Sequence, residues 1–408
     1  MKRTLAFGGV IATAGLLAAG LSAPASAAGD VVGTPLAATG VAGKNIAALW
    51  LAEGAANLIA ATPYDVETKV VAKHISTGGP AADSKPGVVP AIGDEKKSTA
   101  KSKNINLPKT SGKVFFADGF KLVDVPGKEY KKVVAVNPHW CSATSIQASY
   151  KNLVATAGSC VYDTVSNKST LNYWIFVPGY YQGKTPWGVY VGKQAFTHYD
   201  FDVYEDGDRD YAFVTVYNGL KLPHGGFADV KKVSDLGGFA EIDKATWDKY
   251  EPYLKYSANG KYYVWKFVDA GRLGDNVGGQ GLAYNQKVGK PVFVFGYPSG
   301  SHPDGNYAYS GKTLKWSYGK TFAAQAPAIK GEELLGVKSS FTGEGALGSS
   351  WLVGYKNTRR LGYLNGVTIG VSDTDGNNRY DTSVSPYFDG ETYGVYKAAA
   401  NLWSGSIA

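Results

Sequence analysis

From Lys113 onward, short runs of aromatic and β-branched residues alternate with turns marked by glycine. Seven runs have the length and composition of strands, and several alternate apolar with polar side chains: 133–136, 173–177, 189–191, 211–217, 262–268, 292–297 and 363–371. Strands at this spacing, with few long helical patterns, predict an all-β sandwich or barrel. Residues 113–395 are numerous enough for two packed barrels, and a short helix is expected over 395–403.

The first 27 residues have the pattern of a secretory signal. Lys2 and Arg3 precede an apolar stretch, and Ala25-Ser26-Ala27 has the small residues of a cleavage site. Glycines interrupt the stretch, which is too short for the roughly 20 apolar residues of a membrane-spanning helix. We therefore expect a secreted, extracellular protein that has no membrane contact after signal cleavage. Removing the signal takes away two positive charges and no acid, so the net charge falls from +8 to +6.

Residues 28–112 differ in composition from the strand-rich region that follows. Apolar residues at Ile46, Leu49, Leu51 and Leu58 predict a helix over 43–61. The stretch 76–111 has prolines, glycines, a polar run and few apolar residues, which predicts a flexible or disordered linker. The chain is thus divided into a signal (1–27), a helix and linker (28–112), a β domain (113–395) and a C-terminal tail (396–408).

The two cysteines of the chain, Cys141 and Cys160, predict a disulfide in an exported protein. Two cysteines cannot form a structural zinc site, and no two of the five histidines are four residues apart, so we expect no metal and no cofactor. The sequence pI is about 9.0, but the lysines are scattered singly. This pattern favours a solvated basic surface over a nucleic-acid partner.

One acidic loop has the oxygen spacing of a calcium site. In residues 373–377, D-T-D-G-N, side chains with oxygen atoms recur at alternate positions. The downstream glutamate of an EF-hand is absent at the required spacing. An Asx-rich surface turn is therefore the favoured interpretation.

Three motifs follow one another in the strand-rich region. Residues 152–160 read N-L-V-A-T-A-G-S-C, residues 210–214 read D-Y-A-F-V, and residues 345–351 read G-A-L-G-S-S-W. This order resembles the secreted trypsin-like serine peptidases, in particular their glutamyl-endopeptidase-like branch in actinobacteria. The resemblance covers about 113–390 and includes G-K-V-F-F at 112–116, F-G-Y-P at 295–298 and G-Y-L-N-G-V at 362–367. It implies a chymotrypsin-like double β-barrel with a short C-terminal helix, preceded by a propeptide-like segment.

The resemblance assigns the three positions of a catalytic triad, and two of them hold another residue. Ser159 stands where the family has its general-base histidine, and Leu347 stands where it has its nucleophilic serine. Asp210 matches the acid that orients the base. A serine hydroxyl is no base near neutral pH, and leucine has no atom that attacks a carbonyl. We expect Asp210 to bond to Ser159 or to backbone amides, because a buried unpaired carboxylate is costly.

The resemblance also assigns the surroundings of the triad. The oxyanion-hole amides would belong to Gly345 and Leu347, with the leucine side chain filling the mouth of the pocket. A cleft-edge strand would pair with an extended peptide: Thr368, Ile369 and Gly370. Two alternatives that would preserve catalysis are not excluded by the sequence. A register slip would bring a neighbouring hydroxyl into place (Ser349 or Ser350), and another histidine would serve as base (His139 or His198).

These assignments predict a secreted serine peptidase homologue that has lost catalysis. Losing the serine or the histidine of a triad costs roughly 10⁶-fold in turnover, and binding contacts alone leave about 10³–10⁴ over water. We therefore expect a monomeric pseudoprotease that binds peptide or protein. The alternatives are an active serine endopeptidase with an atypical site, and a structural protein that is secreted or associated with the cell wall.

Overall fold

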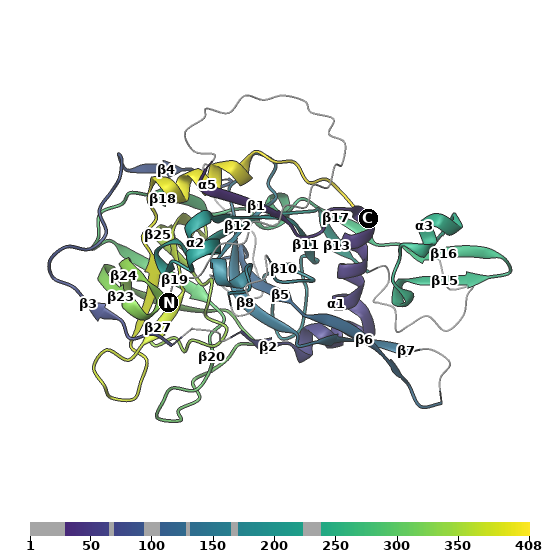
Figure 1. Ribbon diagram of the computed structural model, residues 1–408, viewed down its shortest axis with the longest axis horizontal. Helices are drawn as coiled ribbons and strands as arrows, with labels where there is room; N and C mark the ends of the chain where they lie inside the picture. The colour runs from purple at the N-terminus through teal and green to yellow at the C-terminus, as the bar shows by residue number, and fades with distance from the viewer. Residues whose placement is uncertain (1–28, 65–68, 94–106, 128–130, 165–169, 223–237) are drawn as a thin grey trace, which may run out of the picture.

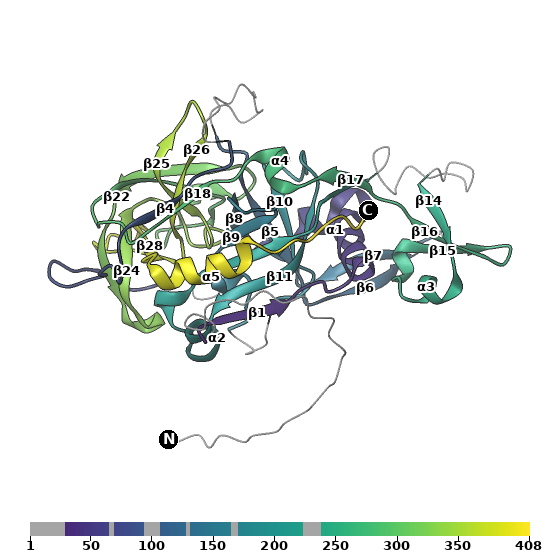
Figure 2. The same ribbon diagram turned by 90° about the horizontal axis from the view of Figure 1, so that it is seen from above.

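The structure is a computed structural model and describes residues 29–64, 69–93, 107–127, 131–164, 170–222 and 238–408. The predicted signal sequence lies outside the described residues. Strands dominate, and they form two barrels that lie side by side with helices at their edges (Figure 1 and Figure 2). The predicted all-β class is confirmed.

The first barrel is a closed ring of six strands, paired in the order β11–β10–β5–β8–β9–β12 and back to β11. Two N-terminal strands extend it, because β1 pairs antiparallel with β11 and β2 pairs parallel with β8. The strands of this barrel are β1 (Val31–Pro35), β2 (Thr62–Pro63), β5 (Ser111–Phe116), β8 (His139–Ile146), β9 (Leu153–Thr156), β10 (Ile175–Pro178), β11 (Tyr190–His198) and β12 (Ala212–Val216).

The second barrel consists of two sheets that pack face to face. A six-stranded sheet has the order β22–β19–β25–β26–β18–β4, and a five-stranded sheet has the order β27–β28–β24–β23–β3. Their strands are β3 (Lys73–His74), β4 (Gly87–Val89), β18 (Gly281–Tyr284), β19 (Pro291–Gly296), β22 (Lys315–Lys320), β23 (Phe322–Ala326), β24 (Gly331–Lys338), β25 (Ser350–Lys356), β26 (Leu361–Val367), β27 (Gly370–Ser372) and β28 (Thr382–Pro386).

Smaller elements lie around the barrels. Four small sheets are formed by β6 (Gly119–Asp124) with β7 (Lys131–Val136), β13 (Gly219–Lys221) with β17 (Val268–Gly271), β14 (Phe239–Ile242) with β16 (Lys261–Trp265) and β15 (Lys255–Ala258), and β20 (Ser299–Gly300) with β21 (Tyr309–Ser310). The helices are α1 (Gly40–Ala60), α2 (Tyr199–Tyr204), α3 (Lys244–Asp248), α4 (Leu273–Val277) and α5 (Gly390–Ala400). Within the described part of the chain, no helix has both the length and the apolar character that crossing a bilayer requires.

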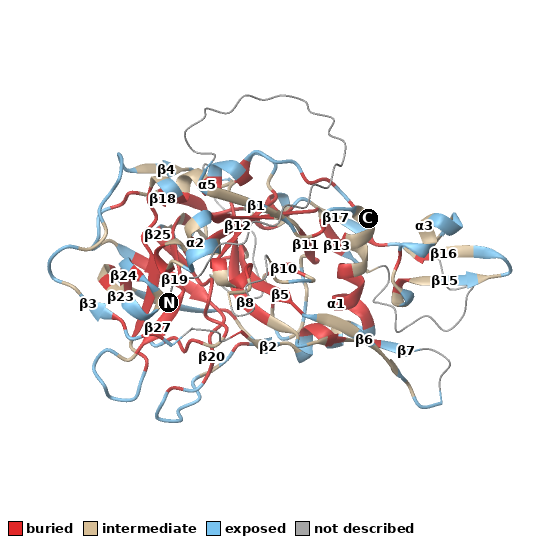
Figure 3. Ribbon diagram, in the orientation of Figure 1, coloured by how far each residue is buried: buried red, intermediate tan, exposed pale blue. Residues whose placement is uncertain are grey.

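The barrels are held by buried side chains on their central strands, which Figure 3 shows in red. Every residue of β12 is buried, because one face fills the first barrel and the other lies under α5, where Phe213 contacts the ring of Tyr396 at 5.6 Å. All seven predicted strands coincide with observed strands, with bounds shifted by a few residues. The predicted strand 363–371 is divided between β26 and β27.

The N-terminal segment is part of both barrels. The predicted helix 43–61 corresponds to α1, whose Trp50 is buried and donates from Nε1 to the carbonyl of Tyr173 at 2.6 Å. The stretch 76–111, predicted as a flexible linker, contains β4, which pairs antiparallel with β18. The prediction is wrong there because a three-residue strand is too short to produce a periodic pattern. Residues 94–106 lie outside the described residues.

The C-terminal helix begins earlier than predicted. It spans Gly390–Ala400 rather than 395–403. The Asp389 carboxylate accepts the N–H of Thr392, and the Thr392 hydroxyl bonds to the N–H of Asp389, which completes a capping box. This reciprocal cap fixes the start of a helix by satisfying two otherwise unpaired N–H groups.

Candidate active site

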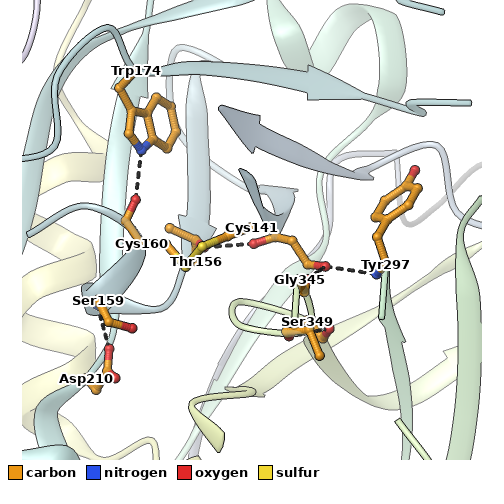
Figure 4. Close-up of a disulfide and its surroundings, with 11 residues drawn as sticks. Cys141, Thr156, Ser159, Cys160, Trp174, Asp210, Tyr297, Gly345 and Ser349 are labelled. Carbon is orange, nitrogen blue, oxygen red and sulfur yellow. Dashed lines mark hydrogen bonds between the residues drawn. A yellow bond between two sulfur atoms is a disulfide. The ribbon is translucent and has the colours of Figure 1, made fainter. Parts of the chain in front are cut away.

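The register of two strands in the first barrel brings Ser159 to Asp210. Strands β9 and β12 pair antiparallel, with Thr156 opposite Ala212, so the turn after β9 faces the residues just before β12. A short 3₁₀ turn, Gly158–Cys160, carries Ser159, and its backbone N–H donates to Asp210 Oδ1 at 2.8 Å (Figure 4). This bond is the backbone-amide alternative that the sequence predicted for Asp210.

The space beside the Ser159 side chain is small. Ser159 Oγ is buried and has no hydrogen-bond partner among the described residues. It lines a cavity of about 20 Å³ together with Asp210, Phe201 and Ile369. That volume holds about one water molecule. This half of the site therefore offers a carboxylate and a hydroxyl in place of the imidazole that serves as general base in a serine-peptidase triad.

The predicted disulfide is present and connects this turn to β8. Cys160 follows Ser159 and is bonded to Cys141 on β8. On the same strand, Ser142 Oγ donates to the carbonyl of Gly345 at 2.8 Å, and Ser142 N–H donates to the carbonyl of Leu347 at 2.8 Å. Figure 4 shows the Ser159 turn, the disulfide and the Gly345 turn in one region. The residues that the resemblance assigned to one site therefore do converge.

The turn at the nucleophile position is tight, and its leucine is buried. Gly345 and Gly348 have φ of +72° and +78°, a conformation that favours glycine. Leu347 is 1 % exposed and belongs to the main hydrophobic core. The sequence placed this side chain at the mouth of a pocket. Because its carbonyl is held by Ser142 on β8, the turn instead packs against the first barrel.

The two neighbouring serines are also buried. Ser349 Oγ donates to the carbonyl of Ala346 at 2.6 Å, and Ser350 Oγ has no described partner and lies in the core. A hydroxyl that attacks a substrate must reach the cleft and contact a base. The register slip considered from the sequence therefore gives no exposed nucleophile at this turn.

The histidines proposed as substitute bases have other contacts. His198 lies at the start of α2, where its Nδ1 accepts the N–H of Asp200 at 3.2 Å and its Nε2 lies 3.7 Å from Glu391. His139 lies on β8, with Nδ1 3.0 Å from Thr62 Oγ1. His198 thus serves as a helix cap, and His139 faces the N-terminal segment.

The three residues predicted as the cleft edge lie between the turn at the nucleophile position and β27. Thr368 is bonded on both sides to the turn at the nucleophile position, because its N–H donates to Ser349 and its carbonyl accepts from Gly348. Ile369 donates its N–H to Val384. Gly370 begins β27, which forms one edge of the five-stranded sheet. The edge strand at this place is therefore β27, which begins after Thr368 and Ile369.

A contact that the sequence did not predict lies at the oxyanion-hole position. The N–H of Gly345 donates to the carbonyl of Tyr64 at 3.3 Å, and the N–H of Tyr64 donates to the carbonyl of Trp140 at 2.9 Å. Tyr64 belongs to the N-terminal segment that precedes the β domain. Nothing in the local pattern around Tyr64 signals this contact, because its partners are far away in sequence.

A second unpredicted feature is a buried lysine behind Trp140. Lys113 Nζ lies 3.2 Å from the centroid of the Trp140 ring and 4.3 Å from that of Tyr180. Burial lowers the pKa of Lys113 well below its usual value of 10.5. The negative ring faces offset part of the cost of a buried ammonium group. The apolar run that follows Lys113 in the sequence is the one signal that it enters a buried strand.

Lys113 makes the free energy of unfolding depend on pH. Because its folded-state pKa is lowered, the unfolded chain binds more protons, and stability rises with pH up to about 10.5. We expect Lys113→Met to abolish this rise. The free energy of unfolding of the variant, relative to that of the wild type, should therefore decrease from pH 7 to pH 10. Urea denaturation at both pH values measures it. The exposed Lys121 on β6 gives the control, since Lys121→Met leaves the slope unchanged. If the free energy of unfolding of Lys113→Met still rose with pH as in the wild type, another group would cause the pH dependence.

The acidic loop forms the expected surface turn. Asp373 accepts the N–H groups of Gly376 and Asn378, each at 2.9 Å. Asp381, which lies within 4.8 Å of Asp373 and Asp375, is bonded to Lys338 Nζ at 3.1 Å and to Thr374. These carboxylates hold the turn together, as an Asx-rich turn predicts.

Comparisons with known proteins give similar structures only. No protein-family model matches the chain, and no curated protein sequence matches it. Among solved structures, the protease Anisep from Arthrobacter nicotinovorans is 22 % identical, with a TM-score of 0.46, over 72 % of this chain and 97 % of that one. The thermostable serine protease AL20 from an extremophilic microorganism is 19 % identical, with a TM-score of 0.45, over 72 % and 97 %. A Glu endopeptidase in complex with MPD is 13 % identical, with a TM-score of 0.40, over 74 % and 96 %.

The strand order of the two barrels decides the fold. The chain folds as a chymotrypsin-like double β-barrel with a short C-terminal helix. The N-terminal segment adds strands to both barrels of this fold. A shared fold by itself does not establish an activity.

Proposed function

We propose that this chain is a secreted, non-catalytic homologue of trypsin-like serine peptidases that binds an extended peptide or protein segment. The buried Leu347 at the nucleophile position supports the loss of catalysis most directly. Ser159 supports it as well, because the position of the general-base histidine holds a serine, whose backbone N–H donates to Asp210. The edge strand β27 supports binding, because residues 69–72 already pair with it, and an edge strand takes up an extended peptide through main-chain hydrogen bonds.

Hydrolysis assays test the loss of catalysis. The secreted chain, with its N-terminal segment intact, is incubated with casein and with fluorogenic peptides, beside Asp210→Ala, Ser349→Ala and Ser159→His/Leu347→Ser. We expect wild-type turnover at the buffer background, because losing one triad member already costs roughly 10⁶-fold. Activity in the double variant alone would show that the fold has kept the rest of the machinery.

Two results contradict this proposal. Wild-type turnover that Asp210→Ala abolishes would show a working site with an unrecognised base. Wild-type turnover that Ser349→Ala abolishes would show that the neighbouring serine is the nucleophile. Either outcome would make the chain an active endopeptidase with an atypical site.

A further inference from the structure

The chain segment between α1 and β4 connects the two barrels across the candidate site. On the first barrel, β2 pairs parallel with β8, with Thr62 opposite His139 and Pro63 opposite Trp140. On the second barrel, β3 pairs with β23. Figure 1 shows β2 beside β8 and β3 beside β23. We call residues 62–64 and 69–74 the cleft segment; the residues between these two parts lie outside the described residues.

At its first end, the cleft segment binds the turn at the nucleophile position. Tyr64 donates its N–H to Trp140 at 2.9 Å and accepts the N–H of Gly345 at 3.3 Å. Its ring is buried, 5.0 Å from the ring of Phe116 and 5.6 Å from that of His139. The carbonyl of Tyr64 thus occupies the amide that would stabilise an oxyanion in a peptidase. An external peptide carbonyl would have to displace it.

At its second end, the cleft segment pairs with β27, an edge strand of the second barrel. Lys69 forms a parallel bridge with Val371, and the N–H of Val70 donates to the carbonyl of Val371 at 2.9 Å. The N–H of Ala72 donates to Ser372 Oγ at 3.0 Å. Val371 and Ser372 belong to β27, the strand whose edge would take an extended peptide. Here that edge is paired with the chain itself.

Side chains alternate along this second end as they do on a strand. Val70 is 8 % exposed and Val71 is 71 % exposed, while Ala72 is again buried. Every second residue therefore faces the second barrel, which is the period of a β-strand. The cleft segment thus binds as an added strand, through backbone hydrogen bonds and buried alternate side chains.

We propose that the cleft is an extended-peptide site that Tyr64 and residues 69–72 occupy as an intramolecular ligand, and that an external peptide binds only after these residues leave. The proposal rests on the proposed peptide-binding function. It assigns the ligand class: an extended peptide with an aromatic residue at the Tyr64 position and small or β-branched apolar residues at the Val70 and Ala72 positions. A tethered ligand acts at an effective concentration of about millimolar, so a free peptide of equal intrinsic affinity binds weakly at micromolar concentration.

Two neighbouring valines provide a matched pair of variants. Val70→Asp places a carboxylate in the buried contact with the second barrel, while Val71→Asp makes the same change on the exposed side of the segment. The probe is a fluorescein-labelled synthetic peptide with the sequence of residues 61–75, and a scrambled peptide is the control. We expect the Kd for the probe to be at least about tenfold lower with Val70→Asp than with the wild type or Val71→Asp, because the binding-competent fraction of the protein rises.

Hydrogen exchange reports on the segment without any added ligand. In Val70→Asp, the amides of Tyr64 and Val70 should exchange faster than in the wild type, while those of β12 keep their protection. Tyr64→Ala is the second variant if Val70→Asp does not fold, and the same two changes are expected from it. Near-ultraviolet circular dichroism verifies that each variant keeps its tertiary packing.

The two readouts separate this inference from the function on which it rests. Equal probe affinity for wild type and Val70→Asp would overturn the occlusion of the cleft and leave peptide binding intact. Faster exchange at Tyr64 and Val70 without probe binding would support the release of the segment and contradict peptide binding by the cleft. Unchanged exchange in both variants would show that these contacts do not hold the segment in place, and would overturn the proposal.

Discussion

Trp50→Ala is expected to lower the free energy of unfolding by about 3–5 kcal/mol, the usual cost of removing a buried tryptophan. Trp50 is 0 % exposed, and its ring lies 5.6 Å from that of Phe115 on β5. The variant also leaves the carbonyl of Tyr173 without the indole donor. The loss should appear in a single urea transition of the whole domain, because α1 packs directly on the first barrel.

A matched control is available in Trp403. Its side chain is 63 % exposed, so Trp403→Ala should change the free energy of unfolding by no more than about 0.5 kcal/mol. Urea denaturation followed by far-ultraviolet circular dichroism measures both variants. If Trp50→Ala unfolded α1 alone and left the transition of the barrels unchanged, the N-terminal segment would be a separable propeptide, as the resemblance implied.

Removing the disulfide is expected to lower the free energy of unfolding by about 3 kcal/mol. Cys141 and Cys160 are 19 residues apart, and their bond closes a loop that contains β9 and the turn with Ser159. In the chain-entropy account, the open loop gains freedom mainly in the unfolded state. The test variant is Cys141→Ala/Cys160→Ala, measured by urea denaturation beside the wild type with and without reductant.

The reductant provides the internal control for this prediction. Reduced wild type should approach the stability of the double variant, and the double variant should not respond to reductant. If the variant lost less than about 0.5 kcal/mol, the bond between β8 and the Ser159 turn would not be needed for the fold. If reductant also lowered the stability of the variant, the reagent would be acting on something other than this bond.

Much of the β architecture could be predicted from local sequence. The runs around Phe213 and Val294 have the composition and spacing of strands, and both form strands in the structure. The helix around Trp50 could likewise be predicted from the spacing of its apolar residues. Prediction and structure differ at the start of α5. The capping box at Asp389 sets where this helix begins, and such a cap is a short motif that leaves no long periodic pattern in the sequence.

The pairing of the N-terminal segment could not be predicted from its sequence. Strands β2 and β3 have two residues each, which is too short for any periodic pattern. Tyr64 contacts Gly345, and Val70 contacts Val371, across separations of more than 250 residues along the chain. Lys113 is a comparable case, because a single lysine beside an apolar run gives no sign of the rings that surround it.

The sequence by itself determined which atoms are available for chemistry. Ser159 and Leu347 have no imidazole and no reactive hydroxyl at the positions where a trypsin-like site needs them, and no fold supplies a missing atom. The tertiary structure decided what surrounds those positions, because contacts between distant segments form only when the barrels assemble. It buried Leu347 and its neighbouring serines in the core. It also placed the carbonyl of Tyr64 on the amide of Gly345, the position that the resemblance assigns to the oxyanion hole.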